Sequence, residues 1–149
     1  MSNLRELYQE VIIDHNKNPR NFKAMKNPTH QAEGFNPLCG DQLKLYLSIE
    51  NNIIQSVSFE GKGCAISTAS ASLMTEALLH KTLDEAEHLF QHFHALMTSV
   101  QEGIEYPELG KLLILKGVRE FPSRIKCATL PWHALHAALY QQQTSVSTE

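Results

Sequence analysis

Three cysteines and one aspartate are the side chains of this 149-residue chain whose types and spacing best suit metal or sulfur chemistry. Cys39 and Asp41 are separated by a single glycine, and Cys64 and Cys127 follow at a distance. Thiolates together with a carboxylate can bind zinc tetrahedrally, and cysteine thiolates also hold iron–sulfur clusters. Four singly charged ligands leave the same net charge around Zn²⁺ and around an oxidised two-iron core, so charge does not distinguish the two.

An aspartate among the ligands affects how long such a site retains a bound metal ion or cluster. A carboxylate oxygen binds sulfur-rich iron less tightly than a thiolate does, so Asp41 favours temporary holding over permanent electron transfer. The cysteine count is odd, and no secretory signal precedes the first amphipathic segment. These features predict a cytoplasmic protein in which thiols stay reduced and bind metal or react, without forming disulfides.

Each cysteine is expected at a boundary between elements of secondary structure. Cys64 opens a predicted helix, and Cys127 is expected just ahead of a last helix that begins near Pro131, because proline is tolerated in a first turn. The N–H groups at a helix N-terminus favour thiolate over thiol. Between Cys39 and Asp41 an extended backbone would point both side chains to the same side. Basic neighbours that could offset the negative ligands are Lys62, Arg124 and Lys126.

Hydrophobic periodicity predicts the elements that must position these side chains. In chain order they are an amphipathic helix ending near 16–19, an irregular stretch at 16–37, strands at 43–49 and 53–60, a helix at 65–80, a helix from 82 to 97, an apolar segment at 109–118 and a final helix from 131. Asn51 and Asn52 suit the turn between the strands, and Thr82 with Glu85 forms a capping-box pattern.

Strands followed by helices predict an α+β fold, with a small antiparallel β-sheet covered by helices. We expect a single domain over residues 1–140, because no internal repeat or second apolar block is present. The polar residues 141–149 are expected to form a disordered C-terminal tail. The net charge of −3 argues against nucleic-acid binding, and no run of about 18 apolar residues is present to span a membrane.

The chain resembles the iron–sulfur cluster assembly proteins IscU and SufU, which share the NifU N-terminal domain fold. Four motifs in family order carry the resemblance over nearly the whole chain. They are Tyr8-x-x-Val11-x-x-Asp14-His15 with Asn18-Pro19-Arg20-Asn21, then Asn36-Pro37-x-Cys39-Gly40-Asp41, then Phe59-x-Gly61-x-Gly63-Cys64-Ala65-Ile66-Ser67, and last Arg124-x-Lys126-Cys127-Ala128-x-Leu130. The chain looks closer to SufU, because Lys126 stands where IscU-like members carry histidine and the segment at 97–120 is longer than theirs.

The resemblance implies that Cys39, Asp41, Cys64 and Cys127 hold zinc, as in SufU-like members. It also implies that Cys39 accepts persulfide sulfur from a cysteine desulfurase and passes it to downstream iron–sulfur assembly or acceptor proteins. The protein would then be a sulfurtransferase partner of that desulfurase. Two alternatives stay open: an IscU-type, non-enzymatic scaffold that assembles a transient [2Fe–2S] cluster or binds iron, and a binding module with a structural zinc site.

Other residues whose types could take part in catalysis or binding have simpler interpretations. His88 with His92, and His133 with His136, are spaced for one helix face but lack any accompanying metal motif, so we expect solvated histidines. Gly61-x-Gly63 is too short for a dinucleotide fingerprint and favours a turn between strand and helix. The Asp14-His15 pair is expected at a helix end, capping the helix or exposed on the surface.

Overall fold

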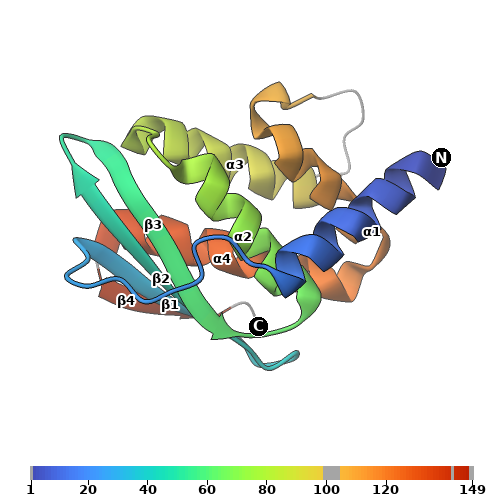
Figure 1. Ribbon diagram of the computed structural model, residues 1–149, viewed down its shortest axis with the longest axis horizontal. Coiled ribbons are helices and arrows are strands. Elements are labelled where there is room, and N and C mark those ends of the chain that lie inside the picture. Colours follow the sequence, from blue (N-terminus) through green and yellow to red (C-terminus); the bar gives the residue numbers. More distant parts are fainter. Residues whose placement is uncertain (1, 99–104, 142, 148–149) are drawn as a thin grey trace.

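The computed structural model describes residues 2–98, 105–141 and 143–147, which form one four-stranded sheet and a set of helices (Figure 1). The strands lie in the order β3-β2-β1-β4. Three of them form an antiparallel meander, and β4 joins its edge parallel to β1. Their bounds are β1 His30–Asn36, β2 Asp41–Glu50, β3 Ile53–Lys62 and β4 Gln143–Ser147. The predicted α+β fold with a small antiparallel sheet is confirmed.

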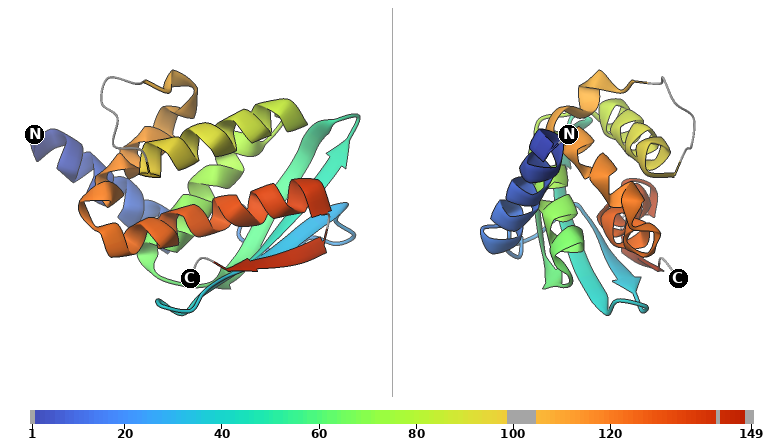
Figure 2. Two further views of the ribbon diagram at one scale, coloured as in Figure 1. Left: turned by 180° about the vertical axis from the view of Figure 1, so that it is seen from behind. Right: turned by 90° about the vertical axis from the view of Figure 1, so that its right-hand side faces the viewer.

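The helices gather on one face of this sheet, and the opposite face of β1 to β3 carries none of the described helices (Figures 1 and 2). Helix α4 packs against β1 and β2, α2 packs against β3, and α1 packs against α2 and η1. Their bounds are α1 Ser2–Lys17, α2 Ala65–Leu78, α3 Leu83–Thr98, the 3₁₀-helical segment η1 Pro107–Glu120 and α4 Pro122–Gln141. In the described parts of the chain, no helix is long and apolar enough to cross a membrane.

The hairpin of β2 and β3 follows the predicted alternation of apolar and polar residues. Leu43, Leu45 and Leu47 are buried under the helices. Asn51 and Asn52 both have positive φ, 52° and 65°, a conformation that asparagine tolerates better than most residues. The hairpin therefore forms where the period-two pattern and the turn residues place it.

Strand β1 lies inside the stretch that was predicted to be irregular, so that part of the prediction is wrong. Its core-facing residues are small or polar, Ala32, Gly34 and Asn36, and give no hydrophobic signal. Their size has a packing reason, because a Cβ added at Gly34 would lie 3.0 Å from a methyl group of Leu130. Small residues in β1 thus let α4 lie close against the sheet.

The C-terminal residues also differ from the expected disordered tail. Gln141 ends α4, and Gln143–Ser147 pairs with residues 31–35 as the parallel edge strand β4. Backbone hydrogen bonds hold an edge strand and need no apolar periodicity, which is why the sequence pattern gave no sign of it. The β-branched residues Thr144 and Val146 are compatible with a strand.

Helices α2 and α3 agree well with the patterns that predicted them. The small residues Ala69, Ser70, Ala71 and Ser72 are buried, which lets α2 pack closely between α1 and α4. Thr82 and Glu85 exchange reciprocal hydrogen bonds at the start of α3: the Glu85 N–H donates to Thr82 Oγ1 at 3.1 Å, and the Thr82 N–H donates to Glu85 Oε1 at 2.9 Å. The predicted capping box is present.

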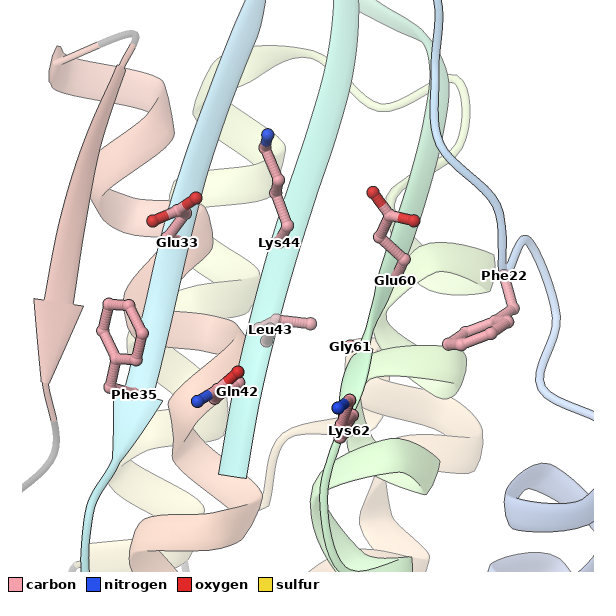
Figure 3. A pocket seen from close by; sticks show the side chains of 9 residues that line it. All are labelled: Phe22, Glu33, Phe35, Gln42, Leu43, Lys44, Glu60, Gly61 and Lys62. Carbon is pink, nitrogen blue, oxygen red and sulfur yellow. The ribbon is translucent and has the colours of Figure 1, made fainter. Parts of the chain in front are cut away.

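A shallow pocket of about 410 Å³ lies on the open face of the sheet, away from the helices (Figure 3). Its lining mixes two aromatic rings with charged side chains of both signs, so it offers no net charge to a ligand. None of the three cysteines lines it. The residues around it are Phe22, Glu33, Phe35, Gln42, Leu43, Lys44, Glu60, Gly61 and Lys62.

Candidate metal centre

Cys39 lies in the tight turn that joins β1 to β2. Asn36 and Asp41 form the last pair of the antiparallel ladder, and residues 37–40 make the turn between them. The Cys39 N–H donates to the Asn36 carbonyl at 3.2 Å, and Gly40 takes a positive φ of 72°. The expected extended backbone between Cys39 and Asp41 is therefore wrong: the turn exposes Cys39, whereas Asp41 is buried at the start of β2.

Cys64 is the N-cap residue of α2, as the sequence predicts. Its backbone is extended, with φ −70° and ψ 168°, and its sulfur accepts the Ser67 N–H at 3.5 Å. Its own backbone N–H donates to Asp41 Oδ1 at 2.8 Å. Gly63 leaves room for this contact, since a Cβ there would come within 2.8 Å of the same oxygen. The glycine before Cys64 thus lets Asp41 reach the start of α2.

Cys127 lies within α4, five residues after the helix begins, and is completely buried. The expectation that the last helix starts near Pro131 is wrong, because Pro131 is inside α4. Proline removes the hydrogen bond to the carbonyl four residues earlier, which here belongs to Cys127. The expected location of Cys127 at a helix N-terminus is therefore wrong as well.

Contacts between α2 and α4 support the backbone beside this proline. Ser70 Oγ donates to the Ala128 carbonyl at 2.6 Å and accepts the Trp132 Nε1–H at 3.2 Å. The indole of Trp132 stacks on Phe93, with ring centroids 4.6 Å apart. These buried contacts fix the helix on both sides of Pro131 and so position Cys127.

The fold brings three of the four predicted side chains into one cluster. Potential ligand atoms of Cys39, Asp41 and Cys127 all lie within 4.8 Å of one another. The Cys127 thiol donates to Cys39 Sγ at 3.4 Å. Cys64 lies outside that limit and joins the cluster through its backbone hydrogen bond to Asp41.

The electrostatics of the cluster differ between its buried and exposed parts. Burial raises the pKa of the Cys127 thiol, and hydrogen bonding to Cys39 and Asp41 raises it further. A hydrogen bond to Cys127 raises the pKa of Arg124, and electrostatic attraction to Cys64 and Cys39 raises it further. Arg124 Nη1 lies 3.7 Å from Cys39 Sγ, so a permanent positive charge faces the exposed sulfur.

Asn36 is a residue of this centre that sequence reasoning missed. Its amide Nδ2 donates to Asp41 Oδ2 at 3.3 Å and to Cys127 Sγ at 3.4 Å, and the side chain is buried. The only sequence signal was its place at the start of the Asn-Pro-x-Cys-Gly-Asp motif, which does not reveal that it contacts Cys127, 91 residues away.

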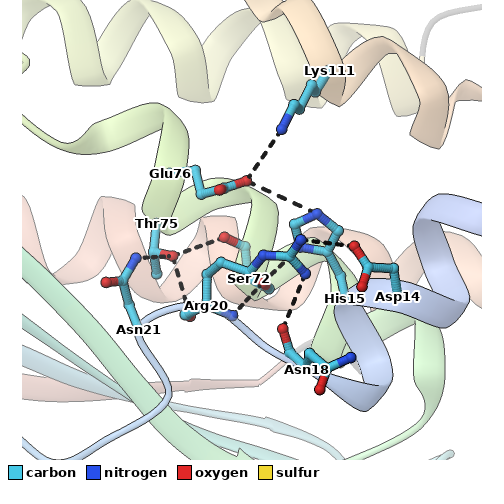
Figure 4. A network of polar contacts seen from close by, with 9 residues as sticks. All are labelled: Asp14, His15, Asn18, Arg20, Asn21, Ser72, Thr75, Glu76 and Lys111. Carbon is cyan, nitrogen blue, oxygen red and sulfur yellow. Dashed lines mark hydrogen bonds and ion pairs between the residues drawn. The ribbon is translucent and has the colours of Figure 1, made fainter.

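Asp14 and His15 lie near the end of α1, and Asp14 is exposed as expected, whereas His15 is buried, contrary to expectation (Figure 4). His15 is 3% exposed, and its Nδ1 is 2.7 Å from Ser72 Oγ in α2. The Arg20 backbone N–H donates to the same hydroxyl at 2.8 Å, and the Arg20 guanidinium pairs with Asp14 at 2.7 Å. This network joins the end of α1 and the following segment to α2, and it has a structural role.

The two histidine pairs lie apart from the cysteine cluster among the described residues. His88 is exposed as expected, but the rings of His133 and His136 are half-buried and pack on Phe90 between α3 and α4. Among the residues that the structure describes, the one cluster with metal-ligand spacing contains no histidine.

Comparison with known proteins gives consistent matches over most of the chain. The family model of the NifU-like N-terminal domain matches residues 7–128. A zinc-dependent sulfurtransferase SufU from Bacillus subtilis is 41% identical over 95% of each chain. An iron–sulfur cluster assembly scaffold protein IscU from Streptococcus pyogenes is 39% identical over 93% of this chain and 86% of its own.

A solved structure supports the same grouping. It is a candidate iron–sulfur cluster assembly scaffold protein for the SUF system from the thermophile Fervidobacterium islandicum. It superposes on 90% of this chain and 97% of its own with a TM-score of 0.84, at 34% identity. The sequence comparisons and the structural comparison therefore point to the same group of proteins.

Proposed function

Because this chain belongs to the family of NifU-like N-terminal domains, we propose that it works in iron–sulfur cluster assembly as a zinc-dependent acceptor of persulfide sulfur. The observation that carries the proposal is the arrangement of the cysteines. Cys39 is exposed on a turn, beside the buried donors Asp41 and Cys127. Such a site can present one sulfur to a partner protein while the other donors stay enclosed.

The residue types of the proposed donor set fit zinc. In a tetrahedral site with ordinary Zn–S and Zn–O bond lengths, donor atoms are about 3.3–3.8 Å apart. The sulfurs of Cys39 and Cys127 are 3.4 Å apart, and Asp41 lies in the same cluster. The residues proposed to hold the metal are these three with Cys64. Zinc bound there would keep the cysteine sulfurs as thiolates.

The proposed transfer step is a thiol–persulfide exchange at Cys39. Its thiolate attacks the outer sulfur of a persulfide carried by a cysteine desulfurase. The sulfur–sulfur bond of the desulfurase breaks, its cysteine leaves as a thiolate, and the outer sulfur stays on Cys39. One bond forms as one breaks, so no external oxidant or reductant is required. Arg124, 3.7 Å from the Cys39 sulfur, would attract the anionic sulfurs that meet there.

The same proposal includes the partners and the location of the protein. A cysteine desulfurase is the sulfur donor, and downstream iron–sulfur assembly or acceptor proteins are the recipients. We assign the protein to the cytoplasm, where free thiols such as Cys39 remain reduced. The relative named a zinc-dependent sulfurtransferase supports the acceptor function for this chain.

A pair of cysteine-to-serine variants tests the proposal. Wild-type protein, Cys39→Ser and Cys127→Ser are each incubated with a cysteine desulfurase and radiolabelled cysteine, and protein-bound sulfur is counted after gel filtration. Cys39→Ser should take up no label and should not accelerate the desulfurase. Cys127→Ser should hold zinc less tightly but, with zinc supplied in excess, still take up label, because it keeps the exposed acceptor. Label uptake and acceleration of the desulfurase by Cys39→Ser would refute Cys39 as the acceptor.

The second candidate function is an IscU-type scaffold on which a [2Fe–2S] cluster is assembled and transferred. The oxygen donor Asp41 favours it, since an oxygen ligand makes a cluster easier to release. The relative named as a scaffold supports it too. Metal and acid-labile sulfide analysis of untagged protein separates the two functions. About one zinc per chain without sulfide supports the acceptor, whereas iron and sulfide in equal amounts support the scaffold.

A further inference from the structure

Asn36 makes two hydrogen bonds that match the two protons of its amide nitrogen. Nδ2 lies 3.3 Å from Asp41 Oδ2 and 3.4 Å from Cys127 Sγ, and the side chain is 1% exposed. An amide NH₂ group has two N–H donors, and a carboxylate and a sulfur are both acceptors. One buried side chain thus bonds two of the proposed metal ligands, one from β2 and one from α4.

The carbonyl oxygen of the Asn36 side chain shows that the two hydrogen bonds of Nδ2 determine how the amide is oriented. Asn36 Oδ1 is buried and has no hydrogen-bond partner among the described residues. Leaving an acceptor unpaired in this way costs about 1–3 kcal/mol. Turning the amide round would place its oxygen against the carboxylate and the sulfur, where both neighbours are acceptors. The orientation of the amide therefore serves its two contacts with the proposed metal ligands and not its own carbonyl oxygen.

We propose that Asn36 is a positioning residue that holds Asp41 and Cys127 in the orientation in which they bind metal, and so slows metal release. This inference rests on the proposed zinc-binding function. Hydrogen bonds to metal ligands fix their orientation, and losing one typically costs about 10–100-fold in metal affinity. Cys39 has no hydrogen bond from the Asn36 side chain: its sulfur contacts Cys127 and Arg124. Asn36 therefore supports the buried donors and leaves the exposed sulfur able to exchange.

Two substitutions at Asn36 separate hydrogen bonding from packing. Asn36→Ala removes the amide, and Asn36→Leu keeps a branched side chain of similar shape without N–H donors. The control is Ser58→Ala, because Ser58 is also 1% exposed in the sheet and its Oγ also has no hydrogen-bond partner in the described part of the chain, where no hydrogen bond joins it to a proposed ligand. Each protein is loaded with one equivalent of zinc, and release to an excess of a chelating dye is timed.

We expect both Asn36 variants to release zinc about 10–100-fold faster than wild type, and Ser58→Ala to release it at the wild-type rate. In Co²⁺-loaded samples, both Asn36 variants should also show weaker sulfur-to-cobalt charge-transfer absorption, because the Cys127 sulfur is no longer held toward the metal. A loss of packing that leaves the Cys127 sulfur in place would not alter that absorption.

Two outcomes would overturn the inference alone: wild-type release by both Asn36 variants, or faster release by Asn36→Ala with wild-type release by Asn36→Leu. The second would mean that the side chain only fills space. A wild-type protein that retains no zinc would instead overturn the proposed zinc-dependent function, and this inference with it.

Discussion

Replacing Gly63 with alanine should displace the Asp41 carboxylate. A Cβ at Gly63 would lie 2.8 Å from Asp41 Oδ1 and 3.3 Å from its Cγ, too close for both groups to keep their positions. Asp41 Oδ1 accepts the backbone N–H of Cys64 at 2.8 Å, and Asp41 is buried. Moving the carboxylate therefore breaks a partly buried hydrogen bond at the start of α2.

The expected loss of stability follows from two opposing terms. A hydrogen bond to a charged group contributes about 1.5–3 kcal/mol. Replacing glycine by alanine restricts the unfolded chain and returns about 0.4–1 kcal/mol. We expect Gly63→Ala to lower the free energy of unfolding by about 1–2 kcal/mol. For a domain of this size that corresponds to a Tm about 2–8 °C lower.

A double-mutant cycle on the metal-free protein tests this reasoning. Urea unfolding is measured for wild type, Gly63→Ala, Asp41→Ala and the double variant. In the Asp41→Ala background the clash with the carboxylate is gone, so Gly63→Ala should be neutral or stabilising by up to about 1 kcal/mol. An equal loss of stability from Gly63→Ala in both backgrounds would refute the proposed clash and point to backbone strain at residue 63.

Two further predictions concern the supports around the site. Ser70→Ala should leave the buried Trp132 N–H unpaired and lower the free energy of unfolding by about 1–3 kcal/mol in urea titrations, and a loss below about 0.5 kcal/mol would contradict this. Burial lowers the pKa of His15, and the nearby positive charge of Arg20 lowers it further. As the pH falls below about 6.5, the unfolded state therefore binds a proton at His15 more readily than the folded state does, and the free energy of unfolding decreases. His15→Gln should make the decrease in Tm between pH 7 and pH 5 shallower than in wild type, whereas an unchanged slope would show that His15 does not cause it.

Features determined by local sequence could be predicted. The alternation at 43–49, the turn at Asn51 and Asn52, and the capping box of Thr82 and Glu85 each depend on residues within a few positions of one another. The location of Cys64 at the start of α2 follows from the glycines before it and the helical pattern after it. These elements needed no information about the rest of the fold.

Features that depend on tertiary contacts could not be predicted in the same way. Strand β1 faces the core with small residues, so only the close approach of α4 explains it. Helix α4 continues through Pro131, and the support from Ser70 on α2 cannot be read from the local sequence. The contact of Asn36 with Cys127 joins residues 91 positions apart. The family motifs in the sequence indicated the four candidate ligands, but not what holds them.

The distances along the chain between the proposed ligands have a consequence during synthesis. Cys39, Asp41 and Cys64 leave the ribosome first, and Cys127 follows 63 positions after Cys64. At a translation rate of about 5–20 residues per second, that interval is about 3–13 s. For that time the nascent chain exposes two thiols and a carboxylate without the buried partner from α4 that completes the cluster. A complete centre can therefore form only after α4 has emerged and packed against the sheet, and a chain interrupted before that point would lack it.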